Sequence, residues 1–176
     1  MDFRPYIKYS STLIETGTHI GTSIQAALDA GFSEIRSVEL YEPSYLYSLK
    51  RFEGDKRVKL FFGKSTDLLP EMIKDIPIPS VFWLDAHPSG PGTAMHEQWL
   101  EGDPEADQAL ILRREVAIII EHGKHVILID DQNTWDNASH LALMIENKYP
   151  GDYSFSMIDE VFHDVFHKEK ILVCLP

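Results

Sequence analysis

Short runs of β-branched, aliphatic and aromatic residues alternate along the chain with longer segments in which apolar and polar residues mix. The apolar runs predict strands at 11–15, 35–40, 57–62, 80–84, 125–130, 153–158 and 170–175. The segments between them predict helices at 22–30, 43–52, 66–74, 105–122 and 136–148. This alternation favours an α/β fold with a mostly parallel sheet covered on both faces. Because no helical pattern separates the last two runs, they predict a closing hairpin with at least one antiparallel strand.

The chain is expected to form one domain over residues 1–176, which is long enough to bury a core of its own. One segment without a clear pattern, residues 86–106, is longer than an ordinary connection. Segments of that length in a compact domain are typical of lids and binding loops. We therefore expect 86–106 to be a lid or a binding loop.

Composition narrows the classes of function. Apolar residues make up 44% of the chain and charged residues 25%, as in ordinary globular proteins. The formal net charge is −12 and no dense basic cluster occurs, which disfavours nucleic acid as a partner. No apolar run approaches the roughly 20 residues that a membrane span needs. The single cysteine, Cys174, lies in an apolar run and is expected to be a buried thiol, so a cytoplasmic location is expected.

The stretch TLIETGTHIGTS, residues 12–23, places two glycines between the end of a predicted strand and the start of a predicted helix. Gly17 and Gly21 would let the backbone turn tightly and approach a ligand closely. The stretch contains neither the G-x-G-x-x-G dinucleotide fingerprint nor the lysine of a phosphate-binding loop. It predicts either a ligand loop or a plain strand-to-helix turn.

Two acids refine this prediction. Glu39 ends the second predicted strand, about 20 residues after the glycines, where a carboxylate can bind both hydroxyls of a ribose; a solvated glutamate is the alternative. Glu15 immediately precedes the turn, and a carboxylate there repels phosphates and attracts a sulfonium or an ammonium. Together the acids indicate a positively charged adenosyl cofactor.

Three further acids follow the fourth and fifth predicted strands. Asp85, with His87 two residues later, ends the fourth strand, and Asp130 and Asp131 end the fifth. If these strands are neighbours, the carboxylates converge, and such oxygen ligands suit Mg²⁺. A cation or shared protons must then relieve their repulsion. The alternative is that one acid caps a turn and the others face solvent.

The order of these motifs, followed by FFGKSTDLLPEM and FWLDAH, resembles the motif series of class I S-adenosylmethionine-dependent methyltransferases over about residues 11–176. The resemblance implies a Rossmann-like, doubly wound seven-stranded sheet with an antiparallel last strand. It also implies S-adenosylmethionine as cofactor. The residues implied to bind it are Glu15, Thr16, Gly17, Thr18, His19, Gly21, Thr22, Ser23, Glu39, Gly63, Lys64, Ser65 and Asp85.

The acids are similar to those of a metal-dependent sugar O-methyltransferase subgroup, the macrocin and aminocoumarin type. That resemblance implies that Asp85, Asp130 and Asp131 hold Mg²⁺. In the subgroup an aspartate two positions after the first ligand is the proposed base, whereas this chain has His87 there. His87 and Asp85 are accordingly the candidate catalytic residues, with His87 able to accept a proton near neutral pH.

The leading hypothesis is a metal-assisted methyltransferase acting on a hydroxyl of a small molecule such as a sugar. A cofactor-binding regulatory module without catalysis, and a magnesium-dependent nucleotide enzyme, are the alternatives. Either 86–106 or a second subunit is expected to close the site, or the substrate is large and exposed, so homo-oligomerisation is left open. The pair His163 and His167 has the spacing of a zinc helix but lacks the glutamate of H-E-x-x-H, which disfavours zinc.

Overall fold

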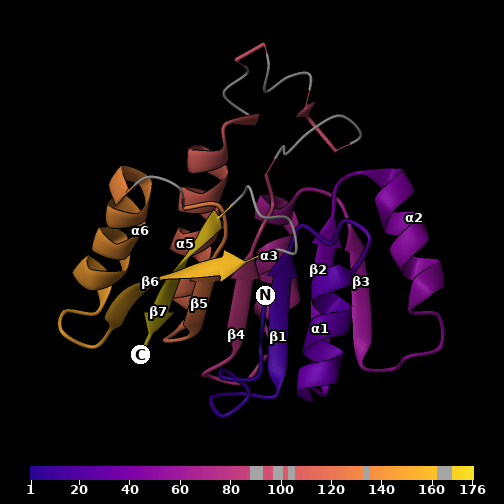
Figure 1. Ribbon diagram of the computed structural model, residues 1–176, viewed down its shortest axis with the longest axis horizontal. Coiled ribbons are helices and arrows are strands. Elements are labelled where there is room, and N and C mark those ends of the chain that lie inside the picture. The colour runs from indigo at the N-terminus through magenta and orange to yellow at the C-terminus, as the bar shows by residue number, and fades with distance from the viewer. Residues whose placement is uncertain (88–92, 97–100, 103–105, 133–134, 162–167) are drawn as a thin grey trace.

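The computed structural model describes residues 1–87, 93–96, 101–102, 106–132, 135–161 and 168–176 (Figure 1). Its strands and helices alternate as the sequence predicts. In chain order they are β1 (Thr12–Thr16), α1 (Thr22–Ala30), β2 (Glu34–Glu39), α2 (Glu42–Arg51), β3 (Val58–Phe62), α3 (Ser65–Ile73), β4 (Val81–Leu84), α5 (Gln108–His122), β5 (Val126–Ile129), α6 (Trp135–Lys148), β6 (Ser154–Val161) and β7 (Lys168–Leu175). All the predicted strands form, with ends that shift by no more than three residues.

The described residues form a seven-stranded sheet in the order β3-β2-β1-β4-β5-β7-β6. Neighbouring strands from β3 to β5 are parallel, whereas β7 pairs antiparallel with both β5 and β6. The predicted fold class, including the antiparallel last strand and the closing hairpin, is confirmed. The strand order reverses between β1 and β4, and a doubly wound sheet binds its ligands at such a point, beyond the carboxyl ends of the strands.

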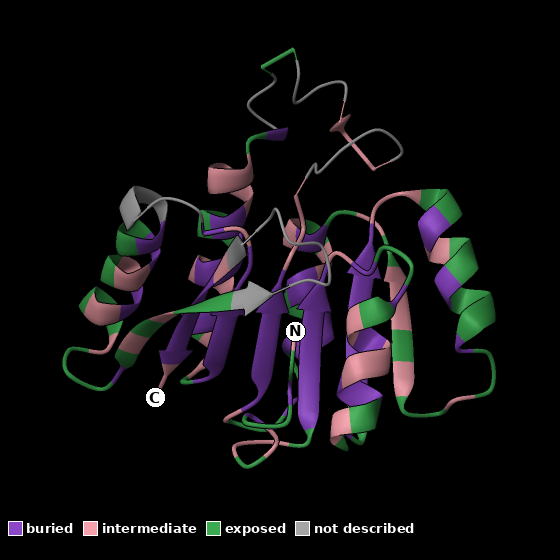
Figure 2. Cartoon of the chain, viewed as in Figure 1, coloured by how far each residue is buried: buried purple, intermediate pink, exposed green. Residues whose placement is uncertain are grey.

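The sheet separates two apolar cores because successive side chains of a strand point to opposite faces (Figure 2). On β1, Ile14 packs with residues of α3, α5 and α6, while Leu13 packs with residues of α1 and the amino-terminal segment. The strands from β4 to β5 divide their side chains in the same way. Burial on both faces explains why these strands appear in the sequence as unbroken apolar runs.

Local signals fix several helix ends. Gly31 follows α1 in the left-handed conformation, and Pro43 lies in the first turn of α2, where its missing N–H is not needed. The helix predicted over 105–122 begins later, at Gln108, because the carboxylate of Asp107 caps it by accepting a hydrogen bond from the backbone N–H of Leu110.

The amino-terminal segment covers the core on the side of α1. Phe3 is fully buried and makes edge contacts with the rings of Phe32 and Trp83. Trp83 therefore belongs to this core. Cys174 is buried in the opposite core, and burial raises the pKa of its thiol to about 12, as expected for an unreactive cysteine.

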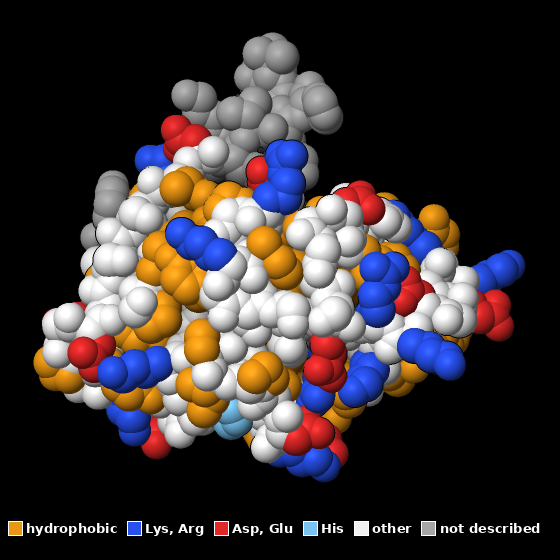
Figure 3. Space-filling model, turned by 90° about the horizontal axis from the view of Figure 1, so that it is seen from below, with side chains coloured by type: hydrophobic (Ala, Val, Ile, Leu, Met, Phe, Trp, Pro, Cys, Tyr) orange, Lys and Arg blue, Asp and Glu red, His pale blue; other side chains and the backbone are white. Residues whose placement is uncertain are grey.

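The end of the molecule opposite the carboxyl ends of the parallel strands carries acidic and basic side chains next to one another, with apolar side chains between them (Figure 3). No helix in the described ranges combines the length and the apolar character that crossing a membrane requires.

Candidate functional site

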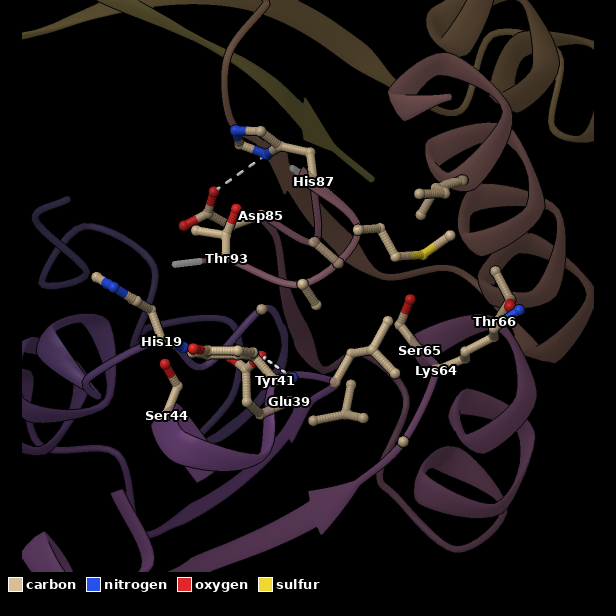
Figure 4. A pocket seen from close by; sticks show the side chains of 18 of the residues that line it. His19, Glu39, Tyr41, Ser44, Lys64, Ser65, Thr66, Asp85, His87 and Thr93 are labelled. Carbon is tan, nitrogen blue, oxygen red and sulfur yellow. Dashed lines mark hydrogen bonds and ion pairs between the residues drawn. The ribbon is translucent and has the colours of Figure 1, made fainter. Parts of the chain in front are cut away.

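A cavity of about 300 Å³ opens beyond the carboxyl ends of the parallel strands, where the strand order reverses (Figure 4). Its walls come from the ends of the five parallel strands and the segments that follow them. The amino-terminal half of α5 completes the wall. The residues that line it are Gly17, His19, Val38, Glu39, Leu40, Tyr41, Ser44, Gly63, Lys64, Ser65, Thr66, Asp85, Ala86, His87, Thr93, Ala94, Met95, Ile111, Arg114, Asp130 and Asp131.

The glycine turn after β1 closes one side of this cavity. Gly17 has a φ of +87°, and a Cβ built there would lie 2.4 Å from the backbone oxygen of Asp85. Gly21 has a φ of +75°, and its Cβ would lie 2.4 Å from the ring of Phe52. Both glycines are therefore required by the tight turn, as predicted, and by close packing against the protein itself. Gly17 lines the cavity, while Gly21 lies outside its lining.

Glu39, at the end of β2, presents its carboxylate to the cavity in a fixed orientation. Its Oε2 accepts a hydrogen bond of 2.7 Å from the backbone N–H of His19, and its Oε1 accepts one of 2.7 Å from that of Tyr41. Glu39 is 8% exposed. Each oxygen keeps a lone pair that can accept a hydrogen bond from a ligand in the cavity, largely shielded from solvent. His19 itself lies on the rim with a φ of +47°, a conformation that few residues other than glycine adopt.

Glu15 lies beneath the turn, outside the lining of the cavity. It is fully buried and accepts hydrogen bonds from the hydroxyls of Ser23 and Ser37. Burial raises the pKa of the Glu15 carboxyl to about 7, against the effect of these hydrogen bonds. Glu15 therefore does not contact a ligand in the cavity directly. It can act on one through its charge, or by holding the turn of Gly17 and Gly21 in place.

The other predicted cofactor residues divide into two groups. Gly63, Lys64 and Ser65 line the cavity after β3. The remainder, Thr16, Thr18, Thr22 and Ser23, lie outside the lining. Thr18 is buried and its hydroxyl lies 2.5 Å from that of Ser37, which ties the turn to β2. Their predicted role in binding stays a prediction.

His87 lies between two of the predicted acids, and Figure 4 shows its contact with one of them, Asp85. Its Nε2 is 2.5 Å from Oδ2 of Asp131, and its Nδ1 is 3.5 Å from Oδ1 of Asp85. The side chain of His87 is 9% exposed, whereas those of Asp85 and Asp131 are 31% and 26% exposed. Asp130 is buried and also lines the cavity. The structure therefore brings all four residues to one edge, as the sequence predicts.

The arrangement of these side chains differs from a metal centre. Within the described part of the chain, no group of three or more His, Cys, Asp and Glu side chains could hold a metal ion. The ring of His87 lies between Asp85 and Asp131, at 3.5 Å and 2.5 Å from their carboxylate oxygens, and so separates the two acids. The magnesium site at Asp85, Asp130 and Asp131 stays a prediction.

Sequence reasoning missed several residues at or below the cavity. Tyr41, Ser44, Ile111 and Arg114 line it, although their sequence context resembles that of ordinary helix residues. Glu115, on α5, is fully buried beneath the cavity floor. A signal for Glu115 exists in retrospect, since it is an acid at helical spacing among apolar residues.

Part of the predicted lid lies outside the described residues, but Thr93, Ala94 and Met95 line the cavity. Whether 86–106 closes over a ligand stays a prediction. His163 and His167 lie outside the described residues.

No protein-family model matches the chain, and no curated protein matches it in sequence. Solved structures do match. The O-methyltransferase TomG from Streptomyces achromogenes, involved in tomaymycin synthesis and solved with S-adenosylmethionine, has a TM-score of 0.61 and 14% identity over 98% of this chain and 75% of its own.

Two further structures match over most of both chains. An O-methyltransferase from Bacillus cereus in complex with S-adenosylhomocysteine has a TM-score of 0.60 and 15% identity, over 99% of this chain and 77% of its own. The methyltransferase domain of bacterial CtHen1 has a TM-score of 0.61 and 13% identity, over 97% of this chain and 92% of its own. At these identities the likeness shows the fold, a Rossmann-like fold shared with methyltransferases.

Proposed function

We propose that this protein is an S-adenosylmethionine-dependent methyltransferase whose acceptor is a hydroxyl group of a small molecule such as a sugar. The observation that carries the proposal is the carboxylate of Glu39, which two backbone amides hold at the edge of a cavity at the strand-order reversal. The fold shared with methyltransferases supports it, although a fold by itself does not fix a function.

The cavity has the features that an adenosyl cofactor needs. Each oxygen of Glu39 retains a lone pair that can accept a hydrogen bond from a ribose hydroxyl. Gly17 and Gly63 bring bare backbone to the wall, which lets a ligand lie close to it. The volume of about 300 Å³ is at the lower end of the range for small-molecule sites. No phosphate-binding loop follows β1, which disfavours a nucleotide enzyme.

His87 is the proposed general base. When bound, the cofactor supplies the methyl group as a sulfonium electrophile, and the electron pair of the methyl–sulfur bond stays on sulfur. Asp131 accepts a hydrogen bond from Nε2–H of His87, which leaves Nδ1 to take the proton of the attacking hydroxyl. The imidazolium that results lies between Asp85 and Asp131, whose charges stabilise it.

The sequence also predicts that a bound Mg²⁺ assists the methyl transfer. Carboxylate oxygens suit Mg²⁺, but the described side chains do not fit an ion as they stand, because His87 lies between Asp85 and Asp131. The proton transfer to His87 needs no cation. A homo-oligomer, a cytoplasmic location and the exclusion of nucleic acid as a partner remain predictions.

The test is calorimetric titration of the protein with S-adenosylmethionine and S-adenosylhomocysteine, with ATP and NAD as comparison ligands. We expect selective binding of the two adenosyl ligands, weakened roughly tenfold or more by Glu39→Gln, because hydrogen bonds to a charged group contribute about 1.5–3 kcal/mol. Glu42→Gln is the matched control, since Glu42 is exposed at the start of α2 and lies outside the lining.

Binding of ATP or NAD in place of the adenosyl ligands would refute the proposal. Binding of S-adenosylmethionine without methyl transfer to any of a panel of hydroxylated acceptors would support the cofactor-binding module instead.

A further inference from the structure

A second buried carboxylate, that of Glu115 on α5, has no role in the proposed function. Glu115 is fully buried on α5, among Leu112, Val116 and Ile119 of the same helix. Ile111, one helical turn earlier, lines the cavity. Since residues four apart lie on one helix face, Glu115 lies one helical turn further along α5 on the face that carries Ile111, outside the lining of the cavity.

Two residues of the site act on Glu115. Its Oε2 accepts a hydrogen bond of 3.3 Å from the hydroxyl of Thr16, the last residue of β1. The hydroxyl of Ser65, which lines the cavity at the start of α3, lowers the pKa of the Glu115 carboxyl. Burial outweighs this effect and raises that pKa to about 7, while Thr16 and the charge of His87 also act to lower it.

The end of β1 consequently lies between two buried carboxylates. Consecutive strand residues point to opposite faces, so Glu15 faces α1 and Thr16 faces α5. Glu15 and Glu115 thus flank the strand from its two sides, below the turn that holds Gly17. Burying a carboxylate is costly, and a glutamine could make the same hydrogen bonds without that cost. The acid at 115 therefore indicates a role that depends on charge.

We propose that the carboxylate of Glu115 makes the cavity prefer a cationic sulfonium ligand over the corresponding neutral thioether. The inference rests on the proposed function, in which the two ligands are S-adenosylmethionine and S-adenosylhomocysteine. Before transfer the buried charge stabilises the cofactor. After transfer the sulfur is neutral, that attraction is lost, and release of the product becomes easier. Glu115 acts across the floor of the cavity without touching the ligand, so it is a positioning residue.

The ratio of the two affinities isolates this effect. Ribose, adenine and amino-acid contacts are the same for both ligands and cancel in the ratio, whereas a charge at the sulfur does not. Two unit charges roughly 10 Å apart at an effective dielectric of about 20 change a binding constant by about tenfold. We expect the preference for S-adenosylmethionine to fall at least about threefold when the charge at 115 is removed.

The experiment is calorimetric titration of wild type, Glu115→Gln, Glu115→Met and Glu121→Gln with both ligands at about pH 8, where Glu115 is ionised. Glu115→Met removes the charge without leaving a buried amide, so it separates the loss of charge from the effect of a new polar group. Glu121→Gln is the matched control, because Glu121 is 71% exposed on the same helix.

We expect both variants at 115 to lose the preference and Glu121→Gln to keep it. If the variants at 115 weaken both ligands equally, Glu115 is only structural and the inference is wrong, while the proposed function stands. If wild type binds neither ligand, the proposed function fails and the inference fails with it.

Discussion

Replacing Gly17 with alanine should destabilise the protein by more than an ordinary glycine substitution in a turn. A residue with a side chain in the left-handed region costs about 1–2 kcal/mol relative to glycine. At Gly17 the new Cβ would also lie 2.4 Å from the backbone oxygen and 2.7 Å from the backbone carbon of Asp85. These backbone atoms directly follow the buried strand β4 and cannot move away as a flexible side chain could.

The turn must therefore separate from the end of β4. Overpacking of this kind costs roughly 1–3 kcal/mol. The movement also strains the hydrogen bonds of 3.0 Å from Gly17 N–H to the carbonyl of Val38 and from Asp85 N–H to that of Thr16. Together these contributions predict a loss of about 2–5 kcal/mol in the free energy of unfolding for Gly17→Ala.

Gly54→Ala is the matched control. Gly54 has a φ of +84°, close to the +87° of Gly17, but a Cβ at Gly54 would meet nothing within 4 Å. Gly54→Ala should therefore lower the free energy of unfolding by only the backbone contribution of about 1–2 kcal/mol. Urea unfolding of wild type and both variants measures the difference. Equal losses for Gly17→Ala and Gly54→Ala would show that the approach to Asp85 does not constrain residue 17, and would refute the reasoning.

Two other predictions concern protons. The pKa of Glu115 is about 7 in the folded protein and near its ordinary 4.5 in the unfolded chain, so between these values only the folded state holds the proton. The free energy of unfolding therefore falls as pH rises from about 4.5 to 7. Glu115 contributes up to roughly 3 kcal/mol to this fall. Urea unfolding at about pH 5 and pH 8 should show this decline to be smaller in Glu115→Gln, and an unchanged decline would contradict it. In an assay with an identified acceptor, His87→Asn should lower the rate of methyl transfer about 100-fold, while EDTA leaves the wild-type rate unchanged. A loss on chelation that Mg²⁺ restores would instead support the cation predicted at Asp85, Asp130 and Asp131.

The order of elements could be predicted from the sequence because its physical causes are local. Apolar runs buried on both faces indicate parallel strands, and the absence of a helical pattern between the last two runs indicates a hairpin. The site edge could be predicted for a related reason. Parallel strands end at one edge of the sheet, so residues that follow them, such as Glu39, Asp85 and Asp131, must gather there.

Three properties of the site depend on contacts between segments far apart in the sequence. Gly17 looks like a ligand-binding glycine, but the backbone of Asp85 also excludes a side chain at that position. His87 looks like a loop residue beside a metal site, yet its ring lies between Asp85 and Asp131. Glu115 looks like one charge of a solvated helix, yet it is buried below the cavity.

The sequence by itself determined the alternation of elements, the doubly wound sheet and the edge on which the acids gather. The reason is that buried strands and amphipathic helices leave local patterns of apolar residues. Only the tertiary structure decided which carboxylates face the cavity and which lie beneath it. That depends on how α5 packs across the end of β1, which brings Glu115 and Thr16 together from positions 99 residues apart. The charge that a ligand meets in this cavity is set by that packing.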